Sequence, residues 1–180
     1  MQNIYITGTG FWIPEDGLTT NDEVVNSYNT YVDNYNSENA EAISDGSLEA
    51  LAPSSSEFIE KASGIKTRYL FDKHNCLDPN RMKPKTRPEL PDNTSILAEM
   101  GIESAKKAIA NAGITADDVD GIILGTSHSA RNYPAIAIEI QEALGINGYA
   151  YDMLVGCSST TFAISNAYSD IASGLASTIL

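Results

Sequence analysis

Residues 151–174, YDMLVGCSSTTFAISNAYSDIASG, decide the fold of this 180-residue chain. The apolar residues at the start of this stretch are typical of a β-strand. The small and apolar residues after Cys157 recur at helical spacing and end at Gly174. A strand that runs into a helix is the repeating unit of α/β proteins. The stretch therefore predicts a strand-to-helix junction, with a cysteine at the junction itself.

The same alternation extends outward along the chain. VDGIILGTS, residues 119–127, has a near-continuous apolar centre, which is typical of a strand covered on both faces. Alternating strands and helices predict an α/β fold with a largely parallel sheet and helices on both faces. The other predicted elements are helices over 94–113 and 134–145, with Pro134 in the first turn of its helix, and strands over 3–10 and 176–180.

Residues 11–92 are less regular. Thr20 and Glu23 have the spacing of a capping box at the start of a helix. Its apolar residues share one helical face: Val24, Tyr28, Tyr31 and Tyr35. A short helix near 58–62 is closed by Gly64. The prolines between residues 72 and 92 predict a loop there.

The charge is unevenly distributed. A formal net charge of -13 argues against general nucleic-acid binding. Residues 61–87 nevertheless hold eight of the eleven basic residues: Lys61, Lys66, Arg68, Lys73, Arg81, Lys83, Lys85 and Arg87. This basic segment is either a solvated loop or a landing site for an anionic partner, such as a phosphorylated cofactor or an acidic carrier protein.

The chain lacks the usual signs of export. It contains no run of eighteen apolar residues, and its first five residues lack the basic and apolar parts of a secretory signal. Cys76 and Cys157 are far apart without CxxC spacing, which gives no support to a disulfide or a metal site. We expect a soluble protein of the reducing cytoplasm, with no membrane association.

Cys157 has two interpretations from the residues alone. Free cysteine is among the most buried residue types, so it could be a packing residue. A strand-to-helix junction instead offers unpaired N–H groups and the positive end of a helix dipole, which favour a thiolate. Its small neighbours Gly156, Ser158 and Ser159 would let a substrate carbonyl approach, with backbone amides to receive an oxyanion. His128, after the strand at 119–127, is either a base for Cys157 or a polar loop residue.

Five segments in order resemble the β-ketoacyl-acyl-carrier-protein synthase III family of the thiolase-like superfamily. They are ITGTGFWIP at residues 6–14, FIEKASGIKTRYL at 58–70, GIILGTS at 121–127, YPAIAIEIQEALG at 133–145 and YDMLVGCSSTTF at 151–162. The resemblance covers nearly all of the chain. It implies the N-terminal half of a thiolase-like layered α-β-α-β-α fold.

The resemblance also implies a condensing enzyme. Cys157 would attack an acyl-CoA thioester and hold the acyl group. Malonyl-acyl-carrier protein would then lose carbon dioxide, and its enolate would attack the acyl-cysteine to give a β-ketoacyl product. The implied activity is that of an acyltransferase of fatty acid biosynthesis or a related pathway. It uses no metal, and coenzyme A enters only as the thioester substrate.

Departures from the family pattern limit this transfer. The family's histidine and asparagine lie in a mirrored second half, so residues 1–180 are expected to form a half-domain whose C-terminal half is absent or lies in a companion chain. Two segments, 28–56 and 72–92, are insertions relative to compact members. Phe58 and Ala62 stand where acetyl-primed members have a tryptophan and an arginine. This pattern resembles the branch that accepts medium-chain acyl-CoA.

The resemblance implies contacts for acyl-CoA, for acyl carrier protein and for a homodimer. Tyr133 matches an aromatic residue that closes the partner's acyl pocket, and its alternative is a surface or core aromatic residue. The expected substrate-binding residues are Phe58, Lys66, Arg68, Tyr133 and Ser158. Two alternative functions stay open: an acyltransferase that condenses without decarboxylation or uses another acceptor, and a non-catalytic partner subunit in which Cys157 is buried.

Overall fold

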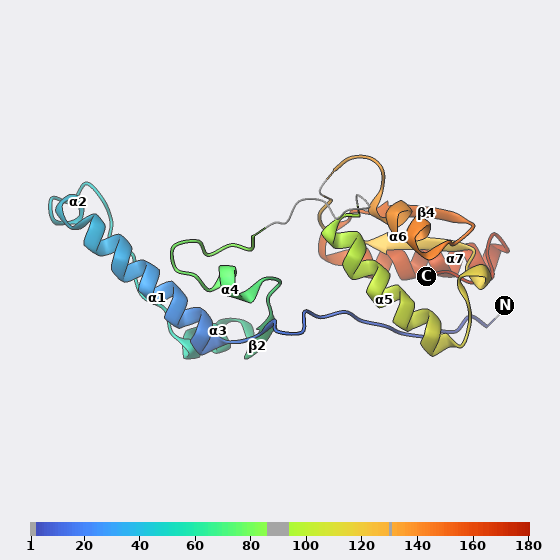
Figure 1. Cartoon of the computed structure of the whole chain (residues 1–180), viewed down its shortest axis with the longest axis horizontal. Coiled ribbons are helices and arrows are strands. Elements are labelled where there is room, and N and C mark those ends of the chain that lie inside the picture. The colour runs from blue at the N-terminus through green and yellow to red at the C-terminus, as the bar shows by residue number, and fades with distance from the viewer. Residues whose placement is uncertain (1–2, 86–93, 130) are drawn as a thin grey trace. The chain divides into compact units, whose positions relative to one another are not determined.

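The computed structural model describes residues 3–85, 94–129 and 131–180. The chain forms two compact units (Figure 1). Unit 1 comprises Met1–Trp12 and Pro88–Leu180, and unit 2 comprises Ile13–Arg87. Within the described ranges, no helix has the length and apolar character needed to cross a bilayer.

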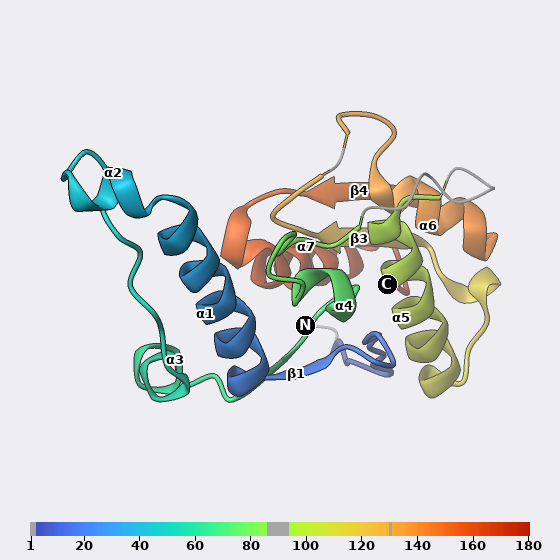
Figure 2. The same cartoon turned by 60° about the vertical axis from the view of Figure 1, so that its left-hand side comes forward.

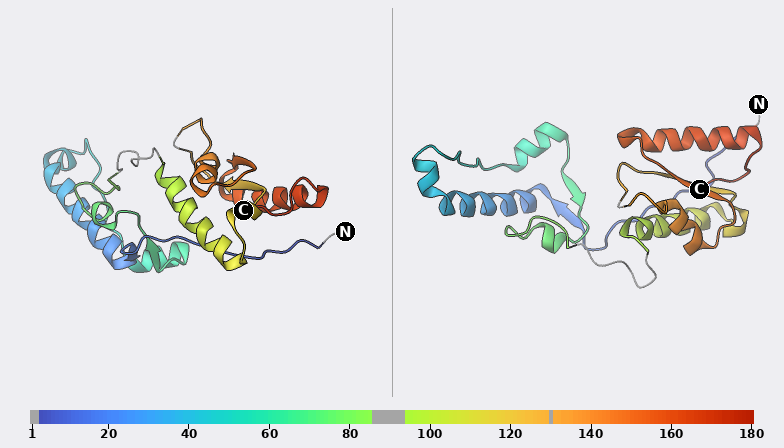
Figure 3. Two further views of the ribbon diagram at one scale, coloured as in Figure 1. Left: turned by 45° about the vertical axis from the view of Figure 1, so that its right-hand side comes forward. Right: turned by 90° about the horizontal axis from the view of Figure 1, so that it is seen from above.

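Unit 1 has three layers. Strand β3 (Gly121–Gly125) pairs in parallel with β4 (Tyr149–Met153), in a register that sets Gly121 opposite Tyr149. Helices α5 (Ile96–Ala112) and α6 (Ile136–Leu144) cover one face of this sheet, and α7 (Ser159–Ser173) covers the other (Figure 3). Two 3-10 turns, η1 (Ala116–Asp118) and η2 (Gly156–Ser158), precede β3 and α7. The predicted strand-helix alternation and the coverage of both faces are confirmed here.

The apolar core of unit 1 lies between the sheet and the pair α5 and α6. Its buried members are Ala98, Ile102, Ala105, Val119, Ile122, Ile136, Ala137, Ile140 and Ile146. Alpha-helical spacing brings the α5 and α6 members onto one face each, as their apolar periodicity predicts. The Ser95 side chain caps α5, and Gly113 ends it in the left-handed conformation that glycine adopts without strain.

Asp152 fastens α6 to the sheet. The residue before α6 offers no side-chain cap, and the carboxylate of Asp152 on β4 accepts hydrogen bonds from the first two N–H groups of the helix instead. The distances are 2.8 Å to Ile136 N and 2.8 Å to Ala137 N. An anion at a helix N-terminus is stabilised by the helix dipole. Asp152 is thus a structural residue of unit 1.

The predicted strand over residues 3–10 is wrong. That segment forms no β-ladder and lies alongside α5. Asn111 Nδ2 of α5 donates to Thr9 O at 2.7 Å, and Lys107 Nζ of α5 donates to Phe11 O, just after the segment, at 2.9 Å. The backbone of β3 is already paired on both edges. β4 lies on one edge, and residues 178–180 bond to the other, with Ile123 N donating to Leu180 O at 3.0 Å. The strand predicted at 176–180 is present only as this short parallel pairing.

Two further boundaries differ from the prediction. Pro134 lies just before the N-cap of α6 rather than in its first turn. The predicted loop over 72–92 contains a four-residue helix, α4 (Lys73–Cys76), because the Asp72 side chain accepts from Asn75 N and caps it. Residues 86–93, which include Arg87 of the basic segment, lie outside the described residues.

Unit 2 is built around one antiparallel pair and one long helix (Figure 2). Strand β1 (Leu18–Thr20) pairs with β2 (Thr67–Tyr69), and α1 (Asn21–Glu38) follows β1 directly. The predicted capping box of Thr20 and Glu23 is confirmed at the start of α1. Short helices α2 (Ala40–Ser44) and α3 (Ser56–Ser63) follow, and Gly64 ends α3 as predicted.

Two asparagines of α1 hold the segment between α2 and α3. Asn29 donates to Ser54 O at 3.0 Å and accepts from Ser54 N at 2.8 Å. Asn36, seven residues later on the same face, bonds in the same two ways to Leu51, at 3.0 and 2.9 Å. Each side-chain amide pairs with a peptide group as a neighbouring strand would. The segment 51–54 therefore lies alongside α1 and forms no helix or strand of its own.

Candidate active site around Cys157

Cys157 lies in the 3-10 turn η2, between the end of β4 and the first residue of α7. The junction was predicted from the sequence; the short turn inside it was not. Cys157 and its neighbours Gly156 and Ser158 are exposed. Gly156 has a φ of +60°, a left-handed conformation that favours glycine. The thiol is therefore open to solvent and bordered by small residues.

Ser159, the first residue of α7, connects this turn to the end of β3. Its side chain is buried, with 3% of the residue exposed. Its Oγ accepts a hydrogen bond from Val155 N at 3.0 Å and lies 2.9 Å from each of two carbonyl oxygens, Thr126 O and Gly156 O. The sequence identifies Ser159 only as a small neighbour of Cys157, because burial cannot be inferred for one serine among four consecutive hydroxyl residues.

Polar side chains fix α7 over β4 along its length. Tyr149 donates to Asp170 Oδ2 at 2.7 Å, and Asn166, one turn earlier on α7, donates to the Tyr151 hydroxyl at 3.2 Å. The two tyrosine rings stack with centroids 6.2 Å apart. Burial, together with the hydrogen bond to Asp170, raises the pKa of Tyr149. These contacts hold the helix that follows Cys157 at a fixed position on the sheet.

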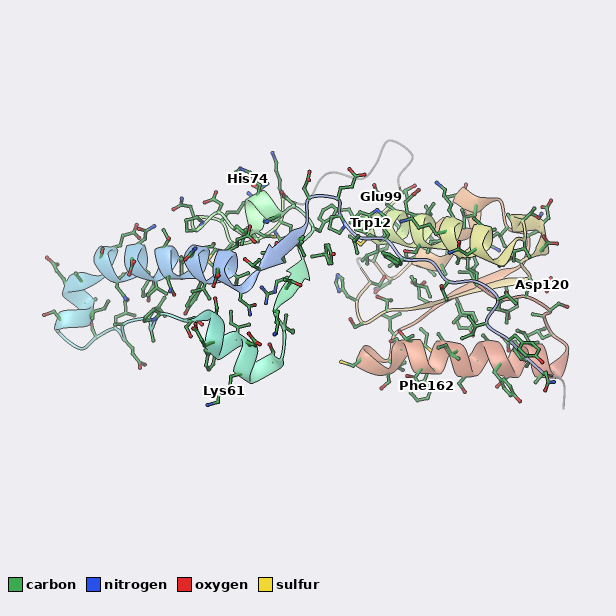
Figure 4. The ribbon with its side chains drawn as sticks, turned by 90° about the horizontal axis from the view of Figure 1, so that it is seen from below. Trp12, Lys61, His74, Glu99, Asp120 and Phe162 are labelled. Atoms are coloured by element: carbon green, nitrogen blue, oxygen red, sulfur yellow. The ribbon has the colours of Figure 1, made fainter. Side chains whose placement is uncertain are left out.

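The opposite end of β3 is tied down by Asp120, which Figure 4 labels. Its carboxylate accepts from Ser177 N at 2.7 Å and from Thr178 N at 3.1 Å. These hydrogen bonds lower the pKa of Asp120. Asp120 thus brings residues 178–180 alongside β3, at the end of the sheet away from Cys157.

His128 lies in the loop after β3 and is exposed. Its backbone is held by Thr126, whose Oγ1 donates to His128 O at 2.9 Å and accepts from His128 N at 3.3 Å. Within the described residues, no carboxylate forms an ion pair with its ring. Among the residues that the structure describes, the Cys-His alternative therefore has no orienting carboxylate of the kind that such a base normally has.

Tyr133 lies on the loop between β3 and α6, and 87% of it is exposed. The residues around it are held in place: Arg131 pairs with Glu139 of α6, and Arg131 Nε donates to Pro134 O at 3.3 Å. Glu139 also accepts from Ser95 N at 2.6 Å, at the start of α5. The tyrosine side chain is thus presented to solvent from an anchored loop.

Phe58, Lys66 and Arg68 lie in unit 2. Phe58 is on α3 with 66% of the residue exposed, and it borders a hollow of about 740 Å³ lined also by Val24, Tyr28 and Met82. Lys66 follows α3 and pairs with Glu60 at 3.2 Å. This pair is largely exposed, and such pairs contribute about 0–1 kcal/mol. Lys61, at the end of α3, is exposed as well (Figure 4).

Arg68 on β2 is engaged inside unit 2. One terminal nitrogen, Nη2, donates to Oδ1 of the buried Asn21, and Asn21 in turn donates to Ile65 O at 2.8 Å. The other terminal nitrogen, Nη1, is buried without a hydrogen-bond partner among the described residues. Asn21 carries no signal of this role in the sequence, since an asparagine at a helix start is usually an exposed cap.

The second cysteine, Cys76, lies in unit 2 on α4 and is partly buried. Its sulfur donates to Phe71 O at 3.4 Å. Burial, with the neighbouring Asp72 carboxylate, raises the pKa of the Cys76 thiol. In the described part of the chain, no group of three or more histidine, cysteine or acidic side chains is arranged to hold a metal ion.

Comparison with known sequences places the chain. It is 53% identical over 154 residues to a protein of Pseudomonas aeruginosa named beta-ketodecanoyl-[acyl-carrier-protein] synthase, over 86% of this chain and 44% of that protein. It is also 35% identical over 134 residues to a beta-ketoacyl-[acyl-carrier-protein] synthase III of Mesorhizobium japonicum, over 74% of this chain and 35% of that protein. The chain belongs to the β-ketoacyl-acyl-carrier-protein synthase III family.

The chain spans less than half the length of these two relatives. No protein-family model matches it. Among solved structures, 3-oxoacyl-[acyl-carrier-protein] synthase III from Aquifex aeolicus superposes with a TM-score of 0.63 at 24% identity, over 94% of this chain and 40% of that one. A priming β-ketosynthase of the R1128 polyketide pathway gives a TM-score of 0.63 at 21% identity, over 94% and 37%. The predicted thiolase-like fold class is confirmed.

Proposed function

We propose that this chain is the acyl-accepting part of a condensing enzyme, and that Cys157 is its nucleophile. The observation that carries the proposal is an exposed cysteine in the turn that starts α7, in a chain 53% identical to a beta-ketodecanoyl-[acyl-carrier-protein] synthase. A packing role for Cys157 fits its exposure poorly, because packing cysteines are buried.

The reaction proposed at Cys157 is acyl transfer from coenzyme A. The Cys157 thiol releases its proton to solvent, its thiolate sulfur forms a bond to the thioester carbonyl carbon, and the carbonyl oxygen becomes an oxyanion. Backbone N–H groups of the turn and the positive end of the α7 dipole stabilise that oxyanion. The carbon-sulfur bond to coenzyme A then breaks, and the coenzyme A thiolate leaves and is protonated from solvent.

The second half of the proposed cycle is condensation. Malonyl-acyl-carrier protein loses carbon dioxide, its enolate carbon attacks the acyl carbon, and the sulfur of Cys157 leaves as the β-ketoacyl product forms. The family's histidine and asparagine for this step are proposed to come from a second half, in the same or a companion chain. The greater length of the relatives supports that arrangement.

The proposed primer is an eight-carbon acyl group. The name of the Pseudomonas aeruginosa relative specifies a ten-carbon β-ketoacyl product, and condensation with a malonyl unit adds two carbons. The resemblance to the medium-chain branch supports the same choice. Octanoyl-CoA is accordingly the substrate with which the proposal is tested.

Phe58 and Lys66 are the proposed coenzyme A contacts of unit 2. An exposed ring can stack on an adenine, and an exposed ammonium suits a phosphate. Arg68 is proposed to support this set by fixing β2, since its guanidinium is bonded to Asn21. The exposed Lys83 and Lys85 of the basic segment suit the anionic acyl carrier protein.

Ser158 and Tyr133 are the proposed contacts of unit 1. Ser158 borders Cys157 and is exposed, so its hydroxyl can face the acyl group. The exposed Tyr133 is proposed to close the acyl pocket of the partner subunit in a homodimer. The two free cysteines agree with the proposed cytoplasmic location.

The test is intact-mass spectrometry of the purified protein before and after incubation with octanoyl-CoA. The expected result is one octanoyl adduct per chain, with none in Cys157→Ala, whose circular dichroism spectrum should match that of the parent protein. Acetyl-CoA serves as the chain-length control and should react more slowly.

An adduct that persists in Cys157→Ala would assign the acyl group to another side chain. A folded protein that takes up no octanoyl group would favour the alternative of a non-catalytic partner subunit. Faster reaction with acetyl-CoA than with octanoyl-CoA would leave the nucleophile in place and contradict the proposed primer.

A further inference from the structure

Ser159 is a buried polar side chain next to an exposed nucleophile. The described residues include only three other buried polar ones, Thr19, Asn21 and Ser27, and all of these lie in unit 2. A hydroxyl can donate one hydrogen bond and accept two. Ser159 uses both capacities: it accepts from Val155 N, and its single proton is shared between the carbonyl oxygens of Thr126 and Gly156.

Two of these three backbone groups belong to Val155 and Gly156, the residues just before Cys157, and the third belongs to Thr126, which directly follows β3. A serine at the start of a helix often bonds to the carbonyl three residues earlier, which would account for Gly156 O alone. That local preference does not account for the contact with Val155 N, nor for the contact with Thr126 O, which lies 33 positions before Ser159 in the chain.

Gly125, the last residue of β3, allows this close approach. A Cβ at Gly125 would lie 2.9 Å from the carbonyl carbon of Ser159 and 3.0 Å from its carbonyl oxygen, which are backbone atoms that cannot move aside. The first turn of α7 therefore lies directly on the end of the strand. That contact places the Ser159 hydroxyl within hydrogen-bonding distance of Thr126 O and supports the turn η2 against the end of β3.

We propose that Ser159 is a positioning residue for the acyl-transfer step, acting through the backbone of the turn that carries Cys157. This inference rests on the proposed function. By fixing Val155 N and Gly156 O, the hydroxyl sets the orientation of the peptide group between Gly156 and Cys157, and hence the direction of the Cys157 N–H. That N–H can stabilise the oxyanion only while it points at the carbonyl oxygen.

A hydroxyl-specific comparison tests this role. Ser159→Ala removes the hydroxyl, and the pair Ser159→Thr and Ser159→Val differ from each other by the hydroxyl at nearly constant volume. Ser169→Ala is the matched control, because Ser169 lies exposed on the same helix and its Oγ donates to Ser165 O at 2.9 Å. Two rates are measured for each protein: octanoylation by octanoyl-CoA and alkylation by iodoacetamide.

Alkylation by iodoacetamide occurs at a saturated carbon and forms no oxyanion, so its rate reports the access to the sulfur and its thiolate character without any contribution from the oxyanion hole. We expect Ser159→Ala and Ser159→Val to lower the octanoylation rate at least about tenfold, less than the roughly 10²–10³-fold cost of removing an oxyanion-hole donor outright, and to leave alkylation within about twofold. Ser159→Thr should stay within about threefold of the parent protein in both rates. Ser169→Ala should leave both rates unchanged.

Equal losses of octanoylation and alkylation in Ser159→Ala would indicate a merely structural role and overturn the proposal. Wild-type octanoylation rates in Ser159→Ala, or equal rates in the Thr and Val variants, would also overturn it. A parent protein that is alkylated at Cys157 but takes up no octanoyl group would contradict the proposed function, and the positioning role with it.

Discussion

The contacts that stabilise the interior of unit 1 differ in kind from those that stabilise the interior of unit 2. In unit 1, nine buried apolar residues form one cluster between the sheet and two helices. In unit 2 the buried apolar residues among those described are Val25 and Val32. Its segments are joined instead by side chains that bond to backbone, such as Asn29, Asn36 and Tyr28, whose hydroxyl donates to Ala52 O at 3.3 Å.

This difference separates the part that performs the proposed chemistry from the part proposed to recognise substrate. Hydrocarbon burial contributes about 25 cal/mol per Å², whereas one hydrogen bond contributes a net 0.5–1.5 kcal/mol or so. A nucleophile needs a rigid support, and Cys157, the proposed nucleophile, has one in the packed layers of unit 1. A recognition surface can tolerate the weaker, more polar construction of unit 2.

The largest effect of a single core substitution is expected in unit 1. Ile136 of α6 is 1% exposed, and Ile136→Ala should lower the free energy of unfolding by about 2–5 kcal/mol through lost burial and the cavity left behind. Ile138→Ala on the same helix is the control, since Ile138 is 36% exposed and should cost less than about 1 kcal/mol. Urea unfolding measures both. Equal losses would mean that the apolar cluster does not dominate the stability of unit 1.

A smaller effect is expected from the amide contacts of unit 2. Asn36→Ala removes both hydrogen bonds to Leu51 and should cost about 1–2 kcal/mol. Hydrogen exchange of the Leu51 amide should become faster. Asn34→Ala, on an exposed position of the same helix, is the control and should leave that exchange unchanged. Unaltered exchange at Leu51 in Asn36→Ala would show that the segment is held by other contacts.

The smallest effect is expected from the charged cap of α1. A hydrogen bond from Lys73, followed by the Thr20 contacts, lowers the pKa of Glu23 from 4.5 to about 2. Because the folded-state pKa is depressed, the stabilisation is present above about pH 4.5 and is lost as the pH falls toward 2. The thermal midpoint of Glu23→Gln should therefore lie below that of the parent protein at pH 7, and the difference should shrink as the pH falls from 4.5 toward 2. A difference independent of pH would contradict this assignment.

Apolar periodicity predicted most of unit 1, because its helices and strands bury one face each. The helix ends at Gly64, Gly113 and Gly174 were predicted from a second local signal, the glycine itself. Each of these glycines has the positive φ that commonly ends a helix. Cys157 was found by its position between a strand and a helix. These features depend on local sequence, which explains why the sequence sufficed.

The features that the sequence did not predict depend on partners distant along the chain. Residues 3–10 have the pattern of a strand, yet β3 is paired with β4 on one edge and with residues 178–180 on the other, and residues 3–10 bond to α5 instead. The hydroxyl of Ser159 and the amide of Asn21 are buried by contacts 33 and 44 positions away. A residue's own neighbours contain no signal for such contacts, so only the folded structure reveals them.

The most direct test of the account compares the two cysteines within one molecule. After incubation with octanoyl-CoA, peptide mapping by mass spectrometry locates the acyl group on Cys157 of unit 1 or on Cys76 of unit 2. We expect it on Cys157 alone, because Cys157 is exposed at the start of α7, whereas burial and Asp72 raise the pKa of Cys76. An octanoyl group on Cys76, or equal labelling of both cysteines, would contradict the claim that the fold of unit 1 makes Cys157 the nucleophile.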